Sequence, residues 1–149
     1  MIVTTEIMIN KPRDSVWNAI TDIEHFESMI SSIIKINVLN KPSDSLVGLK
    51  WEETRIMFGK EAMETMWITD SVLNEYYFTR AESHGSIYIT KHSLSENEKG
   101  TLLTMTFTGN AESFVAKLMS IVLSPLMKGS IKKCLSKDME DIKAYVEKT

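Results

Sequence analysis

This sequence has little of what marks several common classes of protein. Its single cysteine, Cys134, excludes an internal disulfide framework. The formal net charge of -3 gives no electrostatic reason to expect nucleic acid or an anionic membrane as a partner. The longest apolar stretch, 114–127, is too short to span a bilayer and is broken by Lys117 and Pro125. No integral membrane segment is therefore predicted.

The sequence also lacks the motifs that carry familiar chemistry. There is no glycine-rich phosphate loop and no nucleophile elbow. His25, His84 and His92 include no pair at the spacing of zinc ligands, so we predict neither a metal nor any other cofactor. The N-terminus has no basic start followed by a continuous apolar run, as a secretory signal would have. We therefore expect a soluble, cytoplasmic protein.

What is present is the composition of an ordinary globular protein, with 43% hydrophobic and 25% charged residues among 149. This length predicts one domain over residues 1–149. β-branched residues in loose alternation indicate a first strand over 2–9, and residues 13–29 have the spacing of two short helices. Further β-rich runs, separated by short turns, predict an antiparallel meander over 33–38, 47–57, 60–70, 75–82, 86–95 and 101–108.

After residue 110 the period of the apolar residues becomes helical. A stripe at spacings of three and four predicts an amphipathic helix, and it consists of Ile131, Leu135, Met139, Ile142 and Val146. Pro125 predicts a kink or a break. The stretch 114–127 is apolar on almost every side, so it is either enclosed or covered by a dimer partner, a pocket lid or a bilayer surface.

The predicted fold class is α+β: a curved seven-stranded antiparallel sheet wrapped around a long C-terminal helix, with two short helices between strands 1 and 2. This order resembles the START/Bet v 1-like (SRPBCC) superfamily, and within it the polyketide cyclase/dehydrase-like group. The residues that carry the resemblance are Ile9–Pro12 with Val16 and Trp17, Gly48 with 51–62, Gly100–Thr104, and Asp138–Lys143. The resemblance implies a helix-grip fold, and members of the superfamily include carriers, receptors, allergens and cyclases.

The stretch 51–68 predicts a hairpin whose turn lies at Phe58 and Gly59. Paired positions then sum to 117, so that Glu53 faces Glu64 and Arg55 faces Ala62. The side of this hairpin that carries Trp51, Glu53, Arg55, Met57, Glu64, Met66 and Ile68 is the more apolar one, and we assign it to the interior.

Two carboxylates directly opposite one another repel unless Arg55 bridges them or one holds a proton. The group of Glu53, Arg55 and Glu64 has three interpretations: a structural ion pair, an anchor for a ligand's carboxylate or enolate oxygen, or an acid/base pair. The structural role is the commonest of the three for such groups.

His92 alternates with Tyr88 and is expected to face inward, either as a hydrogen-bonded structural residue or as polar lining of a pocket. Ten methionines suit a cavity that adapts to its ligand, or simply fill an irregular core. The predicted ligand-binding residues are Trp51, Glu53, Arg55, Met57, Glu64, Met66, Tyr88, His92, Met105, Phe107, Leu118, Val122 and Leu135.

Three hypotheses about function follow. The first is binding of an apolar or aromatic, lipid- or polyketide-like small molecule between the sheet and the C-terminal helix. The second is a cyclase/dehydratase-like enzyme with Glu53 or Glu64 as the acid/base and Arg55 as the enolate stabiliser. The third is an interaction domain with a filled core, whose function lies on the face of Trp67 or on 114–127. A homodimer is compatible with each.

Overall fold

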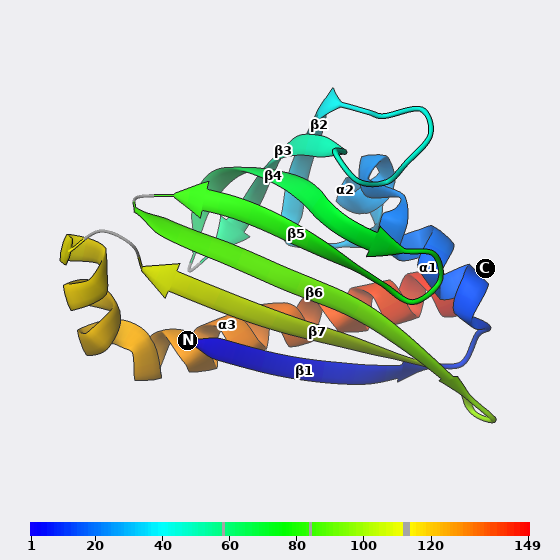
Figure 1. Ribbon diagram of the computed structural model, residues 1–149. Helices are drawn as coiled ribbons and strands as arrows, with labels where there is room; N and C mark the ends of the chain where they lie inside the picture. Colours follow the sequence, from blue (N-terminus) through cyan, green and yellow to red (C-terminus); the bar gives the residue numbers. More distant parts are fainter. Residues whose placement is uncertain (58, 84, 112–113) are drawn as a thin grey trace.

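The computed structural model describes the backbone of residues 1–57, 59–83, 85–111 and 114–149, and the side chains of these residues outside 111–124. Seven strands and one long helix form most of the structure (Figure 1). In chain order the elements are β1 (Ile2–Ile9), α1 (Arg13–Thr21), the 3-10 helix η1 (Ile23–His25), α2 (Phe26–Met29), β2 (Ile33–Asn40), β3 (Lys50–Met57), β4 (Lys60–Val72), β5 (Tyr76–Ser83), β6 (Ser86–Asn97), β7 (Gly100–Ala111) and α3 (Phe114–Lys148).

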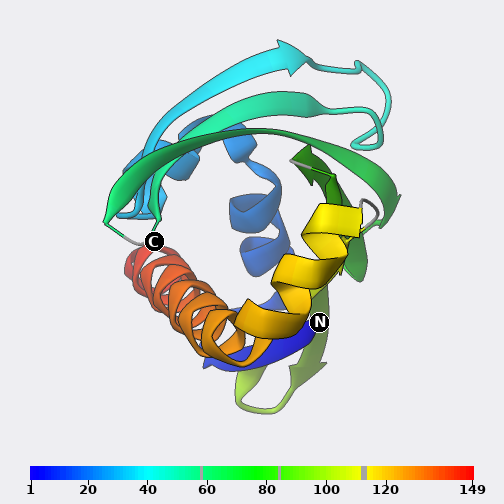
Figure 2. The same ribbon diagram turned by 90° about the vertical axis from the view of Figure 1, so that its left-hand side faces the viewer.

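The seven strands form one antiparallel sheet in the order β1-β7-β6-β5-β4-β3-β2. Strands β2 to β7 are joined in sequence as a meander, and β1 then pairs with β7, with Ile2 opposite Thr108 and Ile9 opposite Thr101. Figure 2 shows the sheet curving around α3, which lies across its concave side. The predicted α+β helix-grip arrangement is confirmed.

The β3–β4 hairpin fixes which side chains face inward. Trp51 lies opposite Met66, Glu53 opposite Glu64 and Arg55 opposite Ala62, so the predicted register is confirmed. The turn accommodates this register through Gly59, whose φ of 77° is one that other residues rarely adopt. Because side chains alternate along a strand, the same register directs Ile56 and Met63, which are 43% and 62% exposed, to the outer face.

Helix α3 packs on the sheet through the predicted apolar stripe. Leu135, Met139, Ile142 and Val146 are all buried. Polar contacts fix the helix along β1: Ser136 Oγ lies 3.2 Å from Thr5 Oγ1, and Lys143 Nζ donates to the carbonyl oxygen of Met8 at 2.6 Å. The position of the helix along the edge strand is thus set by both apolar and polar contacts.

Pro125 lies inside α3, and the ribbon bends there while remaining helical (Figure 1). A proline ring removes one backbone hydrogen bond and crowds the preceding turn, which accounts for the predicted kink. None of the helices in the described part of the chain combines the length and apolar character that crossing a bilayer requires. We predicted that the stretch 114–127 is apolar on almost every side. Most of its side chains lie outside the described residues, so this stays a prediction.

Helices α1 and α2 close one end of the sheet. Val16, Trp17 and Ile20 of α1 are buried, as are Phe26 and Met29 of α2. The hydroxyl of Tyr77 in β5 donates to the carbonyl oxygen of Ile20 at 2.6 Å, so the end of α1 is tied directly to the middle of the sheet.

Replacing Met139 by Ala tests how much of the stability comes from the contact of α3 with the sheet. Met139 is 1% exposed, so we expect Met139→Ala to lower the free energy of unfolding by about 2–5 kcal/mol through lost burial and the cavity left behind. Urea denaturation measures this change. Replacing the neighbouring exposed residue, Glu140→Ala, should change the free energy of unfolding by less than about 0.5 kcal/mol. An equal loss in both variants would contradict the conclusion that the buried side of α3 stabilises its contact with the sheet.

Candidate functional site

A cavity of about 200 Å³ lies between the concave face of the sheet and α3. Its wall is mostly apolar and is formed by β2 to β7, by the end of α1 and α2, and by the middle of α3. The residues that line it are Ile20, Phe26, Ile30, Ile33, Trp51, Glu53, Arg55, Met57, Glu64, Met66, Tyr77, Thr79, Tyr88, Thr90, His92, Met105, Phe107, Met127, Ile131, Cys134, Leu135, Asp138 and Ile142.

The structure brings together the predicted site residues whose side chains it describes. Around this one cavity lie Trp51, Glu53, Arg55, Met57, Glu64, Met66, Tyr88, His92, Met105, Phe107 and Leu135. Leu118 and Val122 lie outside the described side chains. The inward parity of the β3–β4 hairpin and of β6 and β7 explains this convergence, since every second residue of those strands faces α3.

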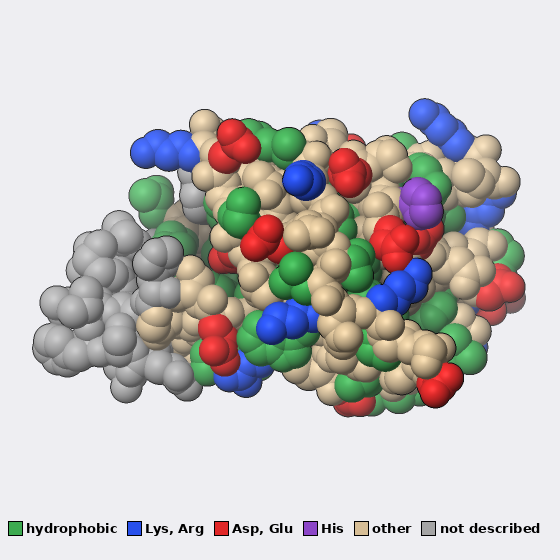
Figure 3. All heavy atoms as spheres, turned by 90° about the horizontal axis from the view of Figure 1, so that it is seen from above, with side chains coloured by type: hydrophobic (Ala, Val, Ile, Leu, Met, Phe, Trp, Pro, Cys, Tyr) green, Lys and Arg blue, Asp and Glu red, His purple; other side chains and the backbone are tan. Residues whose placement is uncertain are grey.

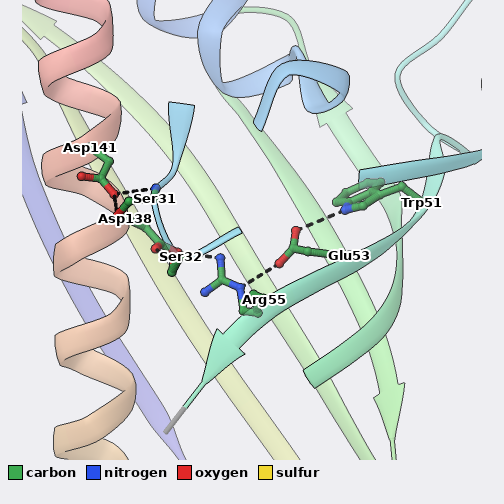
Figure 4. Close-up of polar contacts among 7 residues, drawn as sticks. All are labelled: Ser31, Ser32, Trp51, Glu53, Arg55, Asp138 and Asp141. Atoms are coloured by element: carbon green, nitrogen blue, oxygen red, sulfur yellow. Dashed lines mark hydrogen bonds and ion pairs between the residues drawn. The ribbon is translucent and has the colours of Figure 1, made fainter. Parts of the chain in front are cut away.

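Arg55 is held between two carboxylates at one side of the cavity (Figure 4). Its Nε donates to Glu53 Oε2 at 3.0 Å, and its Nη2 donates to Asp138 Oδ2 at 2.9 Å. The three side chains are 15%, 10% and 7% exposed, respectively. Burial opposes the charge of the guanidinium, but Asp138 and then Glu53 outweigh it, and the pKa of Arg55 is raised above its ordinary value.

This ionic clasp, formed by Glu53, Arg55 and Asp138, extends to the segment that leads into β2. Asp138 Oδ1 accepts a hydrogen bond from Ser32 Oγ at 2.9 Å. One turn later, Asp141 Oδ2 accepts from the backbone N–H of Ser31 at 2.9 Å and from its hydroxyl at 2.7 Å. These contacts, drawn in Figure 4, join β3, α3 and the start of β2 into one polar network.

Asp138 was not among the predicted site residues. The sequence allows Arg55 to bridge Glu53 and Glu64, and the structure shows it paired with Glu53 and also with Asp138 of α3. One signal in the sequence could have indicated this. Asp138 lies three residues after Leu135 and four before Ile142, so it is an acid within the apolar stripe of the helix. A carboxylate at such a position needs a buried partner.

His92 lies on the cavity wall farther along the sheet. Its ring stacks on Tyr77, with centroids 4.4 Å apart and an interplanar angle of 14°. The prediction that His92 is hydrogen-bonded is wrong for one of its two ring nitrogens, because the buried Nδ1 has no hydrogen-bond partner among the described residues. Burial lowers the pKa of His92 to about 4, so the imidazole is neutral at pH 7.

The hydroxyl of Tyr77, beside His92, already has a hydrogen-bond partner, and another part of the cavity wall is aromatic. Burial, with a smaller contribution from Glu53, raises the pKa of Tyr77, whose hydroxyl donates to Ile20. Tyr88 and Phe107 stack with centroids 5.7 Å apart and form an aromatic section of the wall. Within the described part of the chain, no group of three or more His, Cys, Asp or Glu side chains is arranged to hold a metal ion.

Comparison with known proteins gives structural likeness alone. No family model matches the sequence, and no curated protein does. Among solved structures, a START superfamily protein from Mycobacterium smegmatis superposes with a TM-score of 0.82 at 14% identity, covering 99% of this chain and 97% of that one. The Zhui aromatase/cyclase from Streptomyces sp. R1128 gives 0.75 at 12% identity, covering 99% and 93%. Ara h 8.0201 gives 0.72 at 13% identity, covering 100% and 99%.

These neighbours confirm the predicted resemblance at the level of the fold. Their superposition extends over nearly the whole of this chain, so the START-like helix-grip architecture is shared from β1 to α3. Identities of 12% to 14% carry no information about individual side chains. What the cavity of this protein does must therefore be argued from its own residues.

Removing Asp138 from the ionic clasp should be costly, because a buried guanidinium then loses one of its two carboxylates. We expect Asp138→Asn to lower the free energy of unfolding by roughly 3 kcal/mol, measured by chemical denaturation. The exposed pair of Lys41 and Glu24, with atoms 2.6 Å apart, provides the control, and Glu24→Gln should cost less than about 1 kcal/mol. Equal costs would show that the clasp is no stronger than a surface pair.

Stability should also depend on pH through His92. Its folded pKa of about 4 lies below the ordinary 6.5, so the unfolded chain binds the proton more readily. The contribution is complete above pH 6.5 and is lost as the pH falls toward 4, by about 1 kcal/mol per pH unit. His92→Phe should lack this component in denaturation curves, whereas His25→Gln should retain it. The same slope in wild type and His92→Phe would disprove it.

Proposed function

We propose that this protein binds a small, largely apolar molecule that contains an aromatic ring and a neutral polar group such as a hydroxyl. The observation that carries the proposal is the apolar cavity whose wall includes His92, since the buried Nδ1 of this residue has no hydrogen-bond partner among the described residues. A buried polar atom without a partner is costly, and a ligand that supplies the missing hydrogen bond recovers that cost.

The size of the cavity favours a ligand of one or two rings. Engineered cavities of about 150 Å³ bind benzene, and this cavity measures about 200 Å³. Tyr88 and Phe107 offer flat surfaces for an aromatic ring, and Met66 and Met105 offer flexible apolar contacts.

The charges on the wall favour a neutral ligand. Nε and Nη2 of Arg55 already donate to Glu53 and Asp138, and these two carboxylates offset the single positive charge of the guanidinium. A ligand carboxylate would gain little from this compensated guanidinium and would lie close to two negative charges. We therefore infer that Arg55 stabilises the closed structure and does not bind an anionic ligand.

His92 supplies the polar recognition in this proposal. In a neutral imidazole one nitrogen donates and the other accepts, and a hydroxyl can satisfy Nδ1 in either tautomer. A ligand hydroxyl placed against Nδ1 leaves the remainder of the molecule beside the apolar wall, which is the usual division of roles in a small-molecule pocket.

A cyclase/dehydratase-like enzyme is the rival proposal, and an aromatase/cyclase is among the structures with this fold. It would use Glu53 or Glu64 as the acid/base and Arg55 as the stabiliser of an enolate. The contacts of Glu53 favour binding over this chemistry, because its Oε2 accepts from Arg55 at 3.0 Å and its Oε1 from Trp51 Nε1 at 3.4 Å. The third hypothesis, an interaction domain with a filled core, loses support from the presence of the cavity.

Three probes with the same bicyclic ring test the proposal by isothermal titration calorimetry. We expect 2-naphthol to bind about fivefold more tightly than naphthalene, through the hydrogen bond to His92, and 2-naphthoate to bind more weakly than either. His92→Phe should remove the preference for the hydroxyl. Cys134→Phe, which fills the cavity from α3, should abolish binding, whereas Cys134→Ser should retain it. Tightest binding of 2-naphthoate would overturn the argument from charge.

The double variant Arg55→Met/Asp138→Leu separates binding from catalysis. It replaces the buried ion pair by apolar side chains of similar volume, a change that folded proteins often tolerate. A binding protein should keep its affinity for 2-naphthol within a few fold, whereas the enzyme would lose turnover by orders of magnitude. Native mass spectrometry of freshly purified protein, followed by solvent extraction, would identify any compound that co-purifies.

A further inference from the structure

One part of α3 contains several lysines and no acidic residue. Although the chain carries a formal net charge of -3, residues 114–137 contain no Asp or Glu, and their lysines stand at 117, 128, 132, 133 and 137. The first acid after them is Asp138, which is buried in the ionic clasp. The side chains described in this stretch, those of residues 125–137, therefore include lysines and no acidic residue, in contrast to the chain as a whole.

An apolar side chain projects from the same surface. Leu126, one residue after the bend at Pro125, is 76% exposed, which is more than any other large hydrophobic residue among those described. Lys128, Lys132 and Lys133 follow it within two helical turns and are all exposed. A groove along this side of the helix is lined by Gly129, Lys132, Lys133, Ser136, Lys137 and Glu140.

The opposite side of this helical segment belongs to the cavity. Met127, Ile131 and Cys134 line the cavity, while the leucine–lysine face, formed by Leu126, Lys132 and Lys133, points away from it. One helix, about 10 Å across, thus separates the cavity from whatever lies against the leucine–lysine face.

We propose that the leucine–lysine face docks on the surface of an anionic phospholipid bilayer. Clustered lysines attract anionic headgroups, each by a factor of about five in affinity at low ionic strength. An exposed leucine at the end of such a cluster inserts among the acyl chains and gains the free energy of burial. This docking is separate from the proposed ligand and does not depend on it.

A bilayer fits these residues better than a nucleic acid does. Sites for single-stranded nucleic acid combine positive charge with aromatic side chains on which bases stack, and the leucine–lysine face has none. On the face shown in Figure 3, hydrophobic side chains are scattered among acidic and basic ones over the described residues.

Sedimentation with liposomes tests the docking on the full chain. We expect binding to vesicles of phosphatidylcholine with 30% phosphatidylserine, weakening as salt is raised, and little binding to pure phosphatidylcholine. Lys132→Glu/Lys133→Glu should reduce the partition coefficient at least tenfold, and Leu126→Ser about fivefold. The matched control, Lys99→Glu/Lys148→Glu, makes the same change of charge in the β6–β7 turn and at the C-terminal end of α3. These two elements lie at the opposite end of the molecule (Figure 1), and the control should bind like wild type.

Several results would overturn the proposal. These are equal binding to neutral and anionic vesicles, an equal loss in the control variant, or binding to a 20-nucleotide RNA that exceeds binding to the anionic vesicles. Unchanged thermal unfolding of each variant excludes misfolding as the cause of a loss. Because no cavity ligand is used, failure of this test leaves the proposed binding function untouched, and failure of the naphthol titrations leaves the docking untouched.

Discussion

The ion pair between Arg55 and Asp138 is the contact that sets the position of α3 on the sheet. It joins β3 to α3 across the concave side of the sheet, at a place where both side chains are largely removed from water. Charges buried in this way are stable only when their partners are held in position, and Glu53 and Ser32 hold these. The apolar stripe of α3 accounts for its attachment to the sheet, whereas the ion pair determines where along the sheet the helix lies.

That constraint also explains why space remains inside the protein. A helix free to move toward the sheet would settle until the apolar side chains met, because close packing is favourable. The clasp on one side and the contacts of Ser136 and Lys143 with β1 on the other keep α3 at a set distance from the strongly curved sheet. The side chains between them are then too few to fill the volume, and the cavity remains.

Local rules were sufficient to predict the fold, and part of the site could be read from them as well. Alternation along the strands and the turn at Gly59 fix the register of β3 and β4, and the register places Glu53, Arg55 and Met66 on one side. The contact of Arg55 with Asp138 could not be obtained in this way, because it joins positions 83 residues apart on different kinds of element. That Nδ1 of His92 has no hydrogen-bond partner among the described residues could not be predicted from the sequence either, because the absence of a partner depends on every neighbour in three dimensions.

The pairing of β1 with β7 bears on how the molecule assembles. Strands β2 to β7 are linked by short turns and can form by successive local hairpins, but Ile2 must find Thr108 across most of the chain. Contacts of such long range form slowly, since the entropy of closing the loop is lost before they contribute. Until β1 and α3 are in place, the sheet presents its concave apolar side to water. Apolar surface exposed in this way associates readily with other chains, so we expect refolding at high protein concentration to yield aggregate in competition with the native state.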